Sequence, residues 1–198
     1  AWRAEAASCW DRLGEAARLA GAAPKVQDAF ARAAEFRRMA LAADRGNTSF
    51  KRGLAAALIK LGESALEAVS PDAARAAFVE STNLRLELAD AAPKDPASAH
   101  MLAVALERLG LAARACGDFQ AARGAWEEEL DLADRIFADD DSLDALRFRA
   151  IVEAHLASLG GADSDVRRRS ALTRLDALAK AGVLSVQETA LRKRLWSA

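Results

Sequence analysis

The sequence predicts an all-α fold of antiparallel helix pairs arranged as a solenoid, and three observations lead to this prediction. Hydrophobic residues make up 52% of the 198 residues, and alanine, the strongest helix former, is the commonest of them. Only 4 Pro and 11 Gly are present and Tyr is absent, which does not suit a β-rich or Pro/Gly-rich chain. Finally, a set of residues recurs about every 48 positions, as expected of a repeat architecture.

The repeat is clearest at a Leu-Gly pair and at a bulky residue further along each unit. A glycine inside a helix costs about 1 kcal/mol relative to alanine. We therefore expect a neighbouring helix to pass too close for a side chain at each glycine, with Ala74 and Ala122 on the facing helices. We expect a large residue of the next pair to fill the remaining space. The Leu-Gly pairs are Leu13-Gly14, Leu61-Gly62, Leu109-Gly110 and Leu159-Gly160, and the bulky residues are Phe30, Phe78 and Trp126.

Each repeat is long enough for two helices. In the second unit an apolar stripe, which includes Leu54 and Leu58, predicts the first helix, and Pro71 predicts the start of the second. The third unit begins near Pro96, turns at Gly117 and stops in the acidic run at 139–141, which we interpret as a turn that caps the next helix. The predicted pairs are about 1–46, 47–94, 95–141 and 142–182, with a capping helix over 183–198, about nine helices in all.

The end of the chain departs from the repeat. Val166, Leu172, Leu175 and Leu178 form one stripe, and Gly182 ends the helix that carries them. The sequence Ser185-x-x-Glu188 predicts a capping box, which opens a last helix with Leu191, Leu195 and Trp196 on its apolar side. An atypical final unit is expected, because the end of a solenoid must cover its own exposed face.

These motifs resemble the tetratricopeptide repeat family. The family pattern is Trp-x-x-Leu-Gly-x-x-Tyr followed by Ala-x-x-x-Phe and Pro. Trp10-x-x-Leu13-Gly14 matches its first part, and Ala122-x-x-x-Trp126 matches its second. Alanine replaces the family's Tyr, and the period exceeds the usual ~34 residues, about two extra turns per helix. The resemblance covers about residues 1–178 and implies a right-handed solenoid that binds a protein or peptide, similar to long repeats in bacterial signalling and effector proteins.

Charge and hydropathy restrict the function classes. Lys and Arg number 28 and Asp and Glu 29, so we expect no nucleic-acid partner. No apolar run approaches the ~18 residues of a membrane span, and no signal peptide is visible, so we expect no membrane partner. The lone Cys9 and Cys116 predict buried free thiols in a reducing, cytoplasmic setting. The helical pattern starts at once at Ala1, so we expect a piece of a longer chain.

We identify no catalytic residue, no metal ligands and no cofactor site in the sequence. Only two histidines are present, His100 and His155, and neither has a Cys or Ser partner at a recognised spacing. The acidic run at 139–141 lacks the alternating ligands and the central glycine of a calcium loop. We therefore predict a protein that binds rather than catalyses.

The resemblance implies that the first helix of each pair lines a concave groove. The family's groove positions lie three and two residues before each repeated glycine and one residue after it, with others a turn away. Basic residues at one of these positions suggest a ladder able to hold carboxylates or backbone carbonyls of an extended peptide. The predicted partner-binding residues are Arg12, Lys60, Arg108, Arg52, His100, Ile59, Leu111, Glu63 and Glu107. The family's pocket for a C-terminal carboxylate is not expected, because Asp11 and Glu15 occupy its Lys and Asn positions.

Two alternatives stay open. The basic residues also have acidic neighbours in sequence, so this face is also compatible with ion pairs on a solvated surface. The array could instead associate with itself or with its own effector domain, which the apolar Ile59 and Leu111 on the predicted inner face would favour. The leading prediction is a recruitment or sensor scaffold within a larger bacterial protein.

Overall fold

The computed structural model describes residues 2–138, 140 and 142–197, and in these residues the chain forms nine α-helices in succession. Consecutive helices pack as adjacent pairs within each part of the chain, which confirms the predicted all-α helical array. The helices are α1 (Trp2–Leu19), α2 (Ala23–Ala43), α3 (Thr48–Glu67), α4 (Pro71–Ala91), α5 (Pro96–Ala115), α6 (Phe119–Ile136), α7 (Leu143–Ala157), α8 (Ser164–Lys180) and α9 (Val186–Ser197).

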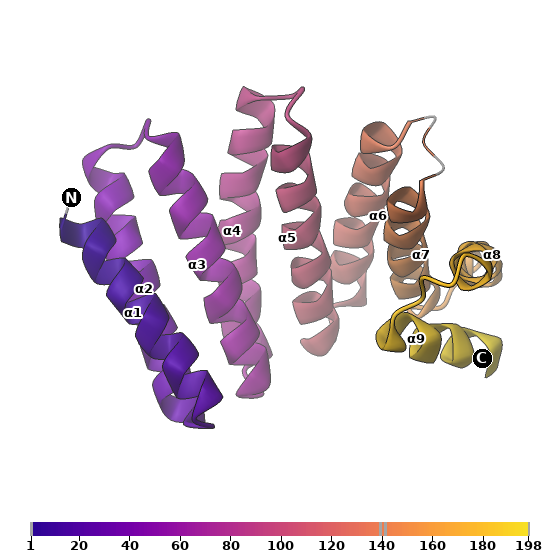
Figure 1. Cartoon of the computed structure of the whole chain (residues 1–198), viewed down its shortest axis with the longest axis horizontal. Coiled ribbons are helices and arrows are strands. Elements are labelled where there is room, and N and C mark those ends of the chain that lie inside the picture. Colours follow the sequence, from indigo (N-terminus) through magenta and orange to yellow (C-terminus); the bar gives the residue numbers. More distant parts are fainter. Residues whose placement is uncertain (1, 139, 141, 198) are drawn as a thin grey trace. The chain divides into compact units, whose positions relative to one another are not determined.

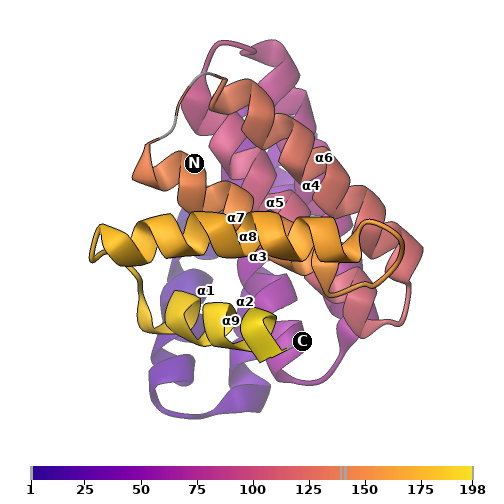
Figure 2. The same cartoon turned by 90° about the vertical axis from the view of Figure 1, so that its right-hand side faces the viewer.

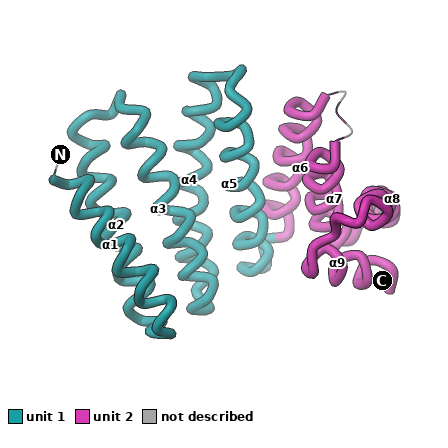
Figure 3. Tube along the Cα trace, viewed as in Figure 1, with its two compact units in different colours: residues 1–118 teal, residues 119–198 magenta. Residues whose placement is uncertain are grey.

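The chain divides into two compact units, residues 1–118 and 119–198, shown in different colours in Figure 3. Unit 1 holds α1 to α5, and unit 2 holds α6 to α9. The division falls between α5 and α6, the two helices of the predicted third pair. Each unit is therefore described by itself.

In unit 1 each helix runs antiparallel to the one before it, joined by short turns (Figure 1). Polar residues cap the starts of the first helices α3 and α5. The Asn47 side chain accepts a hydrogen bond from the Phe50 amide at 3.1 Å, and Asp95 accepts from the Ala97 and Ser98 amides. Pro71 and Pro96 occupy the first positions of α4 and α5, where no amide hydrogen is needed.

Within each of the first two pairs, a glycine of the first helix lies against an aromatic ring of the second. A Cβ built on Gly14 would lie 2.6 Å from Cε1 of Phe30, and one built on Gly62 would collide with the ring of Phe78. Both rings are completely buried. A side chain at either glycine would thus overlap the ring, so the glycine allows the two helices to approach this closely.

This arrangement corrects two expectations. The ring that fills the space beside each of these glycines belongs to the same pair rather than to the next one, and the glycine faces the ring rather than a small residue. Gly160 also does not share the role, because it is exposed, lies beyond the end of α7 and has a φ of +71°. A left-handed backbone of this kind favours glycine, so Gly160 ends a helix.

Successive pairs of unit 1 contact each other through the leucine that precedes each glycine. Leu61 of α3 packs against the cluster of Ala17, Val26 and Phe30 in the first pair. Leu109 of α5 packs in the same way against the cluster around Phe78 in the second pair. Each first helix after α1 therefore covers the ring of the preceding pair.

Unit 2 has its own core. Ala150, Ala171, Leu175, Leu178 and Leu195 belong to one buried cluster contributed by α7, α8 and α9. The last two helices, α8 and α9, are neighbours that run in opposite directions (Figure 2). The loop between them turns after Gly182, whose φ is +71°, as predicted for the end of α8.

The predicted capping box at the start of α9 is present. The Ser185 hydroxyl accepts a hydrogen bond from the Glu188 amide at 3.1 Å, and the Glu188 carboxylate accepts from the Ser185 amide at 2.7 Å. The assignment of two residues to the apolar stripes is wrong, because Val166 is 59% exposed and Trp196 is 64% exposed. Val166 lies in the first turn of α8 and Trp196 near the end of α9, where few neighbours can cover a side chain.

The prediction of buried thiols is also wrong. Both cysteines are free, but Cys9 is exposed and Cys116 is half-buried, with its thiol donating to Asp72 at 3.5 Å. In the acidic run before α7, Asp140 accepts hydrogen bonds from Ser142, whose hydroxyl in turn caps α7 at the Ala145 amide. Asp139 and Asp141 lie outside the described residues.

None of the helices in the described part of the chain combines the length and the apolar character that crossing a bilayer requires.

We predict that Gly62→Ala lowers the free energy of unfolding by about 1–2 kcal/mol, because overpacking against Phe78 outweighs the better helix propensity of alanine. Gly124→Ala is the matched control: Gly124 lies exposed inside α6, and a Cβ there meets no atom within 4 Å. This variant should gain up to about 1 kcal/mol. Urea unfolding followed by circular dichroism gives both values, and a stabilised Gly62→Ala would contradict the glycine–ring contact.

Candidate partner-binding face

The nine predicted partner-binding residues all lie in unit 1, on the helices α1, α3 and α5. We call the surface that they occupy the first-helix face. Arg12, Arg52 and His100 are exposed, and the other six are half-buried. The structure thus places the predicted residues on the first helices, at positions that solvent or a partner can reach.

The basic residues of this face do not form an open ladder, because two of the three are bound by acids of the preceding first helix. The Lys60 ammonium on α3 lies 2.9 Å from a Glu15 carboxylate oxygen on α1. The Arg108 guanidinium on α5 lies 3.1 Å from a Glu63 carboxylate oxygen on α3. Glu15 and Glu63 occupy the same repeat position, so the two ion pairs are equivalent, and we call them the rungs.

Sequence reasoning paired these charges differently. It placed acids beside bases along one helix, whereas both rungs join different helices. Only the pair of Arg108 with its neighbour Glu107, at 3.9 Å, follows the sequence-adjacent pattern. The sequence does contain a signal for the pairing between helices, because Glu15 and Glu63 lie 48 residues apart, as do Lys60 and Arg108.

Arg12 occupies the same repeat position as Lys60 and Arg108 but is exposed, and it has no ion pair among the described residues. Its sequence neighbour Asp11 is bound elsewhere, 2.6 Å from the guanidinium of Arg37 on α2. Arg12 is therefore the base of this row that a partner can approach without displacing an internal acid.

The remaining residues of the first-helix face differ in character. Ile59 is half-buried and packs beside the cluster around Phe78, and Leu111 is also half-buried. Burial raises the pKa of Glu107, which the positive charge of Arg108 partly opposes. The face thus combines charged rungs with partly covered apolar side chains, and an extended peptide can use both kinds of contact.

Arg52 lies at the edge of a concavity of about 360 Å³ formed by α3, α4 and α5. Buried Arg85 of α4 also lines this concavity, and sequence reasoning did not select it. His100 lies one helix along, at the repeat position of Arg52. Arg52 and His100 are thus placed on successive first helices, as the prediction requires.

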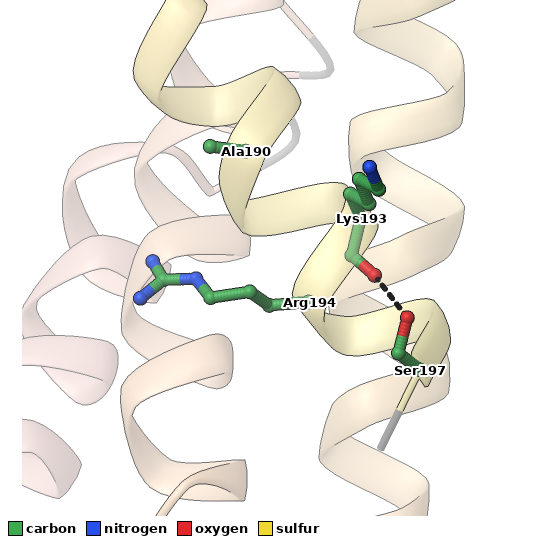
Figure 4. Close-up of a pocket in the computed structure, with 4 residues that line it drawn as sticks. All are labelled: Ala190, Lys193, Arg194 and Ser197. Carbon is green, nitrogen blue, oxygen red and sulfur yellow. Dashed lines mark hydrogen bonds between the residues drawn. The ribbon is translucent and has the colours of Figure 1, made fainter.

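A second concavity, of about 450 Å³, lies on α9 in unit 2 and is lined by Ala190, Lys193, Arg194 and Ser197 (Figure 4). The four residues come from one helix. The Ser197 hydroxyl donates to the Lys193 carbonyl at 3.0 Å, and the Arg194 side chain extends away from α9. A surface of a single helix positions no converging groups, so this concavity is a weaker candidate than the first-helix face.

Comparison with known proteins gives no family: the sequence matches no protein-family model, and no curated protein shows significant similarity to it.

We predict that the rung between Glu63 and Arg108 contributes about 0.3–1 kcal/mol of coupling energy to unit 1, since both side chains are about one-third exposed. A double-mutant cycle with Glu63→Gln and Arg108→Gln, measured by urea unfolding, gives this value. The coupling should weaken as salt is raised.

Arg12→Gln provides the comparison for that cycle. Because Arg12 has no ion pair among the described residues, its removal should leave the free energy of unfolding nearly unchanged. A coupling energy of zero between Glu63 and Arg108 at low salt would contradict the predicted contribution of this rung.

Proposed function

We propose that the protein is a tetratricopeptide-like scaffold that binds a protein or peptide along the first-helix face and performs no reaction. The observation that carries this proposal is the pair of rungs, which join α1 to α3 and α3 to α5 at one repeat register. Three first helices of unit 1 thereby form one continuous charged surface. Such a surface is preformed, so a partner that lies along it avoids the cost of ordering a flexible receptor.

The packing of unit 1 supports the family assignment. The Leu-Gly motif of the tetratricopeptide pattern places Gly14 and Gly62 against rings of the second helices. Leu61 and Leu109, which precede the glycines of the second and third units, cover the ring of the preceding pair. These contacts assign a packing role to the residues that define the motif, despite the long 48-residue period.

Within this proposal the protein acts as a recruitment or sensor part of a larger bacterial signalling or effector protein, in the cytoplasm. Charged rungs on the first-helix face would set the orientation of a peptide, and Ile59 and Leu111 would contact its apolar side chains. Exposed Arg12 would supply a cation for an acidic group at the α1 end of the surface.

A second candidate function, self-association or packing against its own effector domain, is favoured by the surface of α1. Leu13 is 52% exposed, whereas its repeat equivalents Leu61 and Leu109 pack on the preceding pair. Arg12 and Leu13 therefore leave exposed on α1 the surface through which the equivalent residues of α3 and α5 contact the preceding first helix or pair. Sedimentation of the wild type and of Leu13→Glu tests the self-association form of this candidate, which requires an oligomer that the substitution disperses.

We predict that exchanging the charges of both rungs weakens partner binding while preserving the fold. The variant carries Glu15→Lys, Lys60→Glu, Glu63→Arg and Arg108→Glu, so each ion pair persists with reversed polarity. A peptide ligand selected on a peptide array with the purified chain is then measured by fluorescence anisotropy. Its affinity should fall about tenfold or more, as for loss of a central charged contact.

The matched control exchanges an ion pair on a second helix, Arg32→Glu with Glu35→Arg on α2. This exposed pair lies outside the first-helix face, so peptide affinity should stay at the wild-type value. Equal affinity for the wild type and the exchanged-rung variant would refute binding through the first-helix face.

A further inference from the structure

Arg85 is a buried cation without an acid, although an equivalent residue in the same unit has one. Arg37 on α2 and Arg85 on α4 occupy the same repeat position, 48 residues apart. Arg37 is paired with Asp11 at 2.6 Å, whereas the position equivalent to Asp11 in the next pair holds Ile59. The repeat thus retains the guanidinium and replaces its carboxylate by an apolar side chain.

Nothing else in the described residues takes the place of that carboxylate. The Arg85 residue is only 9% exposed, and it forms no ion pair with the described residues. Its Nε atom is buried and lacks a hydrogen-bond partner. A buried charge is normally paired, because desolvation strongly disfavours an isolated one, so this exception requires a physical explanation.

Arg85 lines the concavity of about 360 Å³ between α3, α4 and α5, which we call the arginine pocket. Arg52 lines it from α3, and its like charge adds to burial in lowering the pKa of Arg85. Two guanidinium groups therefore share one concave site with a single carboxylate, that of Asp95, which interacts electrostatically with Arg52. Such a pair is expected to attract an anion.

Among the described residues that line the pocket, Asp95 is the only acid, and its carboxylate is already hydrogen-bonded. Its carboxylate accepts hydrogen bonds from the Ala97 and Ser98 amides and, at 2.6 Å, from the Ser98 hydroxyl. These bonds cap α5 and hold the pKa of Asp95 low. With two arginines and one aspartate, the lining has an excess of one positive charge, which one carboxylate would neutralise.

The remaining lining suggests the shape of the ligand. Leu88 lies one turn after Arg85 on α4, and Met101 faces the pocket from α5. These side chains offer apolar contact next to the charged groups. A carboxylate attached to a short apolar stem matches this arrangement better than a compact, highly charged phosphate, which Asp95 would repel more strongly than a singly charged carboxylate.

We propose that the arginine pocket binds a carboxylate on a short apolar stem, held by the guanidinium groups of Arg85 and Arg52. The carboxylate replaces the acid that Asp11 supplies to Arg37 in the first pair. It comes either from a small free molecule or from an acidic side chain of a peptide. The site shares Arg52 with the first-helix face, but its central residue belongs to the second helix α4, and it does not require the proposed function.

Titration of the ¹⁵N-labelled chain with hexanoate, followed by nuclear magnetic resonance, tests the proposal. The Nε–H signal of Arg85 should move in a saturable manner as the orphan donor gains an acceptor. The neutral 1-hexanol and inorganic phosphate are the comparison probes, and both should bind at least about tenfold more weakly. Titration with the blocked tripeptide Ala-Glu-Ala distinguishes a peptide side chain from a free carboxylate, according to which binds more tightly.

Three variants complete the test. Arg85→Met keeps most of the side-chain volume and should abolish the response to hexanoate, and exposed Arg52→Gln should weaken it without affecting the fold. Arg37→Met is the matched control, because its arginine already has Asp11, so hexanoate affinity should not change. Absence of saturable binding by the wild type, equal binding of phosphate, or unchanged affinity in both Arg85→Met and Arg52→Gln would overturn the proposal.

Discussion

The close approach of a helix glycine to a buried aromatic ring is the contact on which the rest of unit 1 depends. Gly14 faces Phe30 and Gly62 faces Phe78, and in both cases any side chain at the glycine would overlap the ring. The glycines have a lower helix propensity than alanine, and the burial of two whole phenylalanine side chains offsets this cost. The contact therefore fixes the distance between the two helices of each of these pairs. The other interactions of the unit depend on that distance.

The same spacing determines how the pairs join. Because the ring lies level with the glycine, the leucine before the next glycine can cover it, as Leu61 and Leu109 do. The first helices are thereby brought near enough for the Glu15–Lys60 and Glu63–Arg108 ion pairs. The apolar contacts supply most of the stability, since partly exposed ion pairs contribute little. The ion pairs chiefly determine the charge pattern that a partner would meet.

Much of the fold could be predicted because helix starts, stops and stripes are local signals. The capping box of Ser185 and Glu188 and the proline starts of α4 and α5 follow from neighbouring residues alone. The predictions were wrong where the three-dimensional surroundings of a residue determine its role. Gly160 shares the Leu-Gly motif of Gly14, but a short α7 ends before it, and only the backbone reveals that it terminates a helix. The exposure of Leu13 depends on which neighbour covers α1.

The candidate site shows the same limit. Sequence register placed Arg12, Lys60 and Arg108 on one face but could not show which acids bind them, because both rungs join different helices. Arg85 escaped notice because a lone arginine in a helix is unremarkable in sequence. Arg85 can be recognised as a buried cation without an acid only when its exposure is known and Ile59 is compared with the equivalent Asp11.

The most direct test of the account is the proton chemical shift of the glycine Cα hydrogens. Hydrogens that lie over an aromatic ring experience its ring current. Gly14 and Gly62 should therefore show strongly displaced signals, whereas exposed Gly124, with no neighbour near its Cβ position, should not. Phe78→Leu should return the Gly62 signal to an ordinary value and leave that of Gly14 in place. Ordinary shifts at both Gly14 and Gly62 in the wild type would contradict the glycine–ring contact.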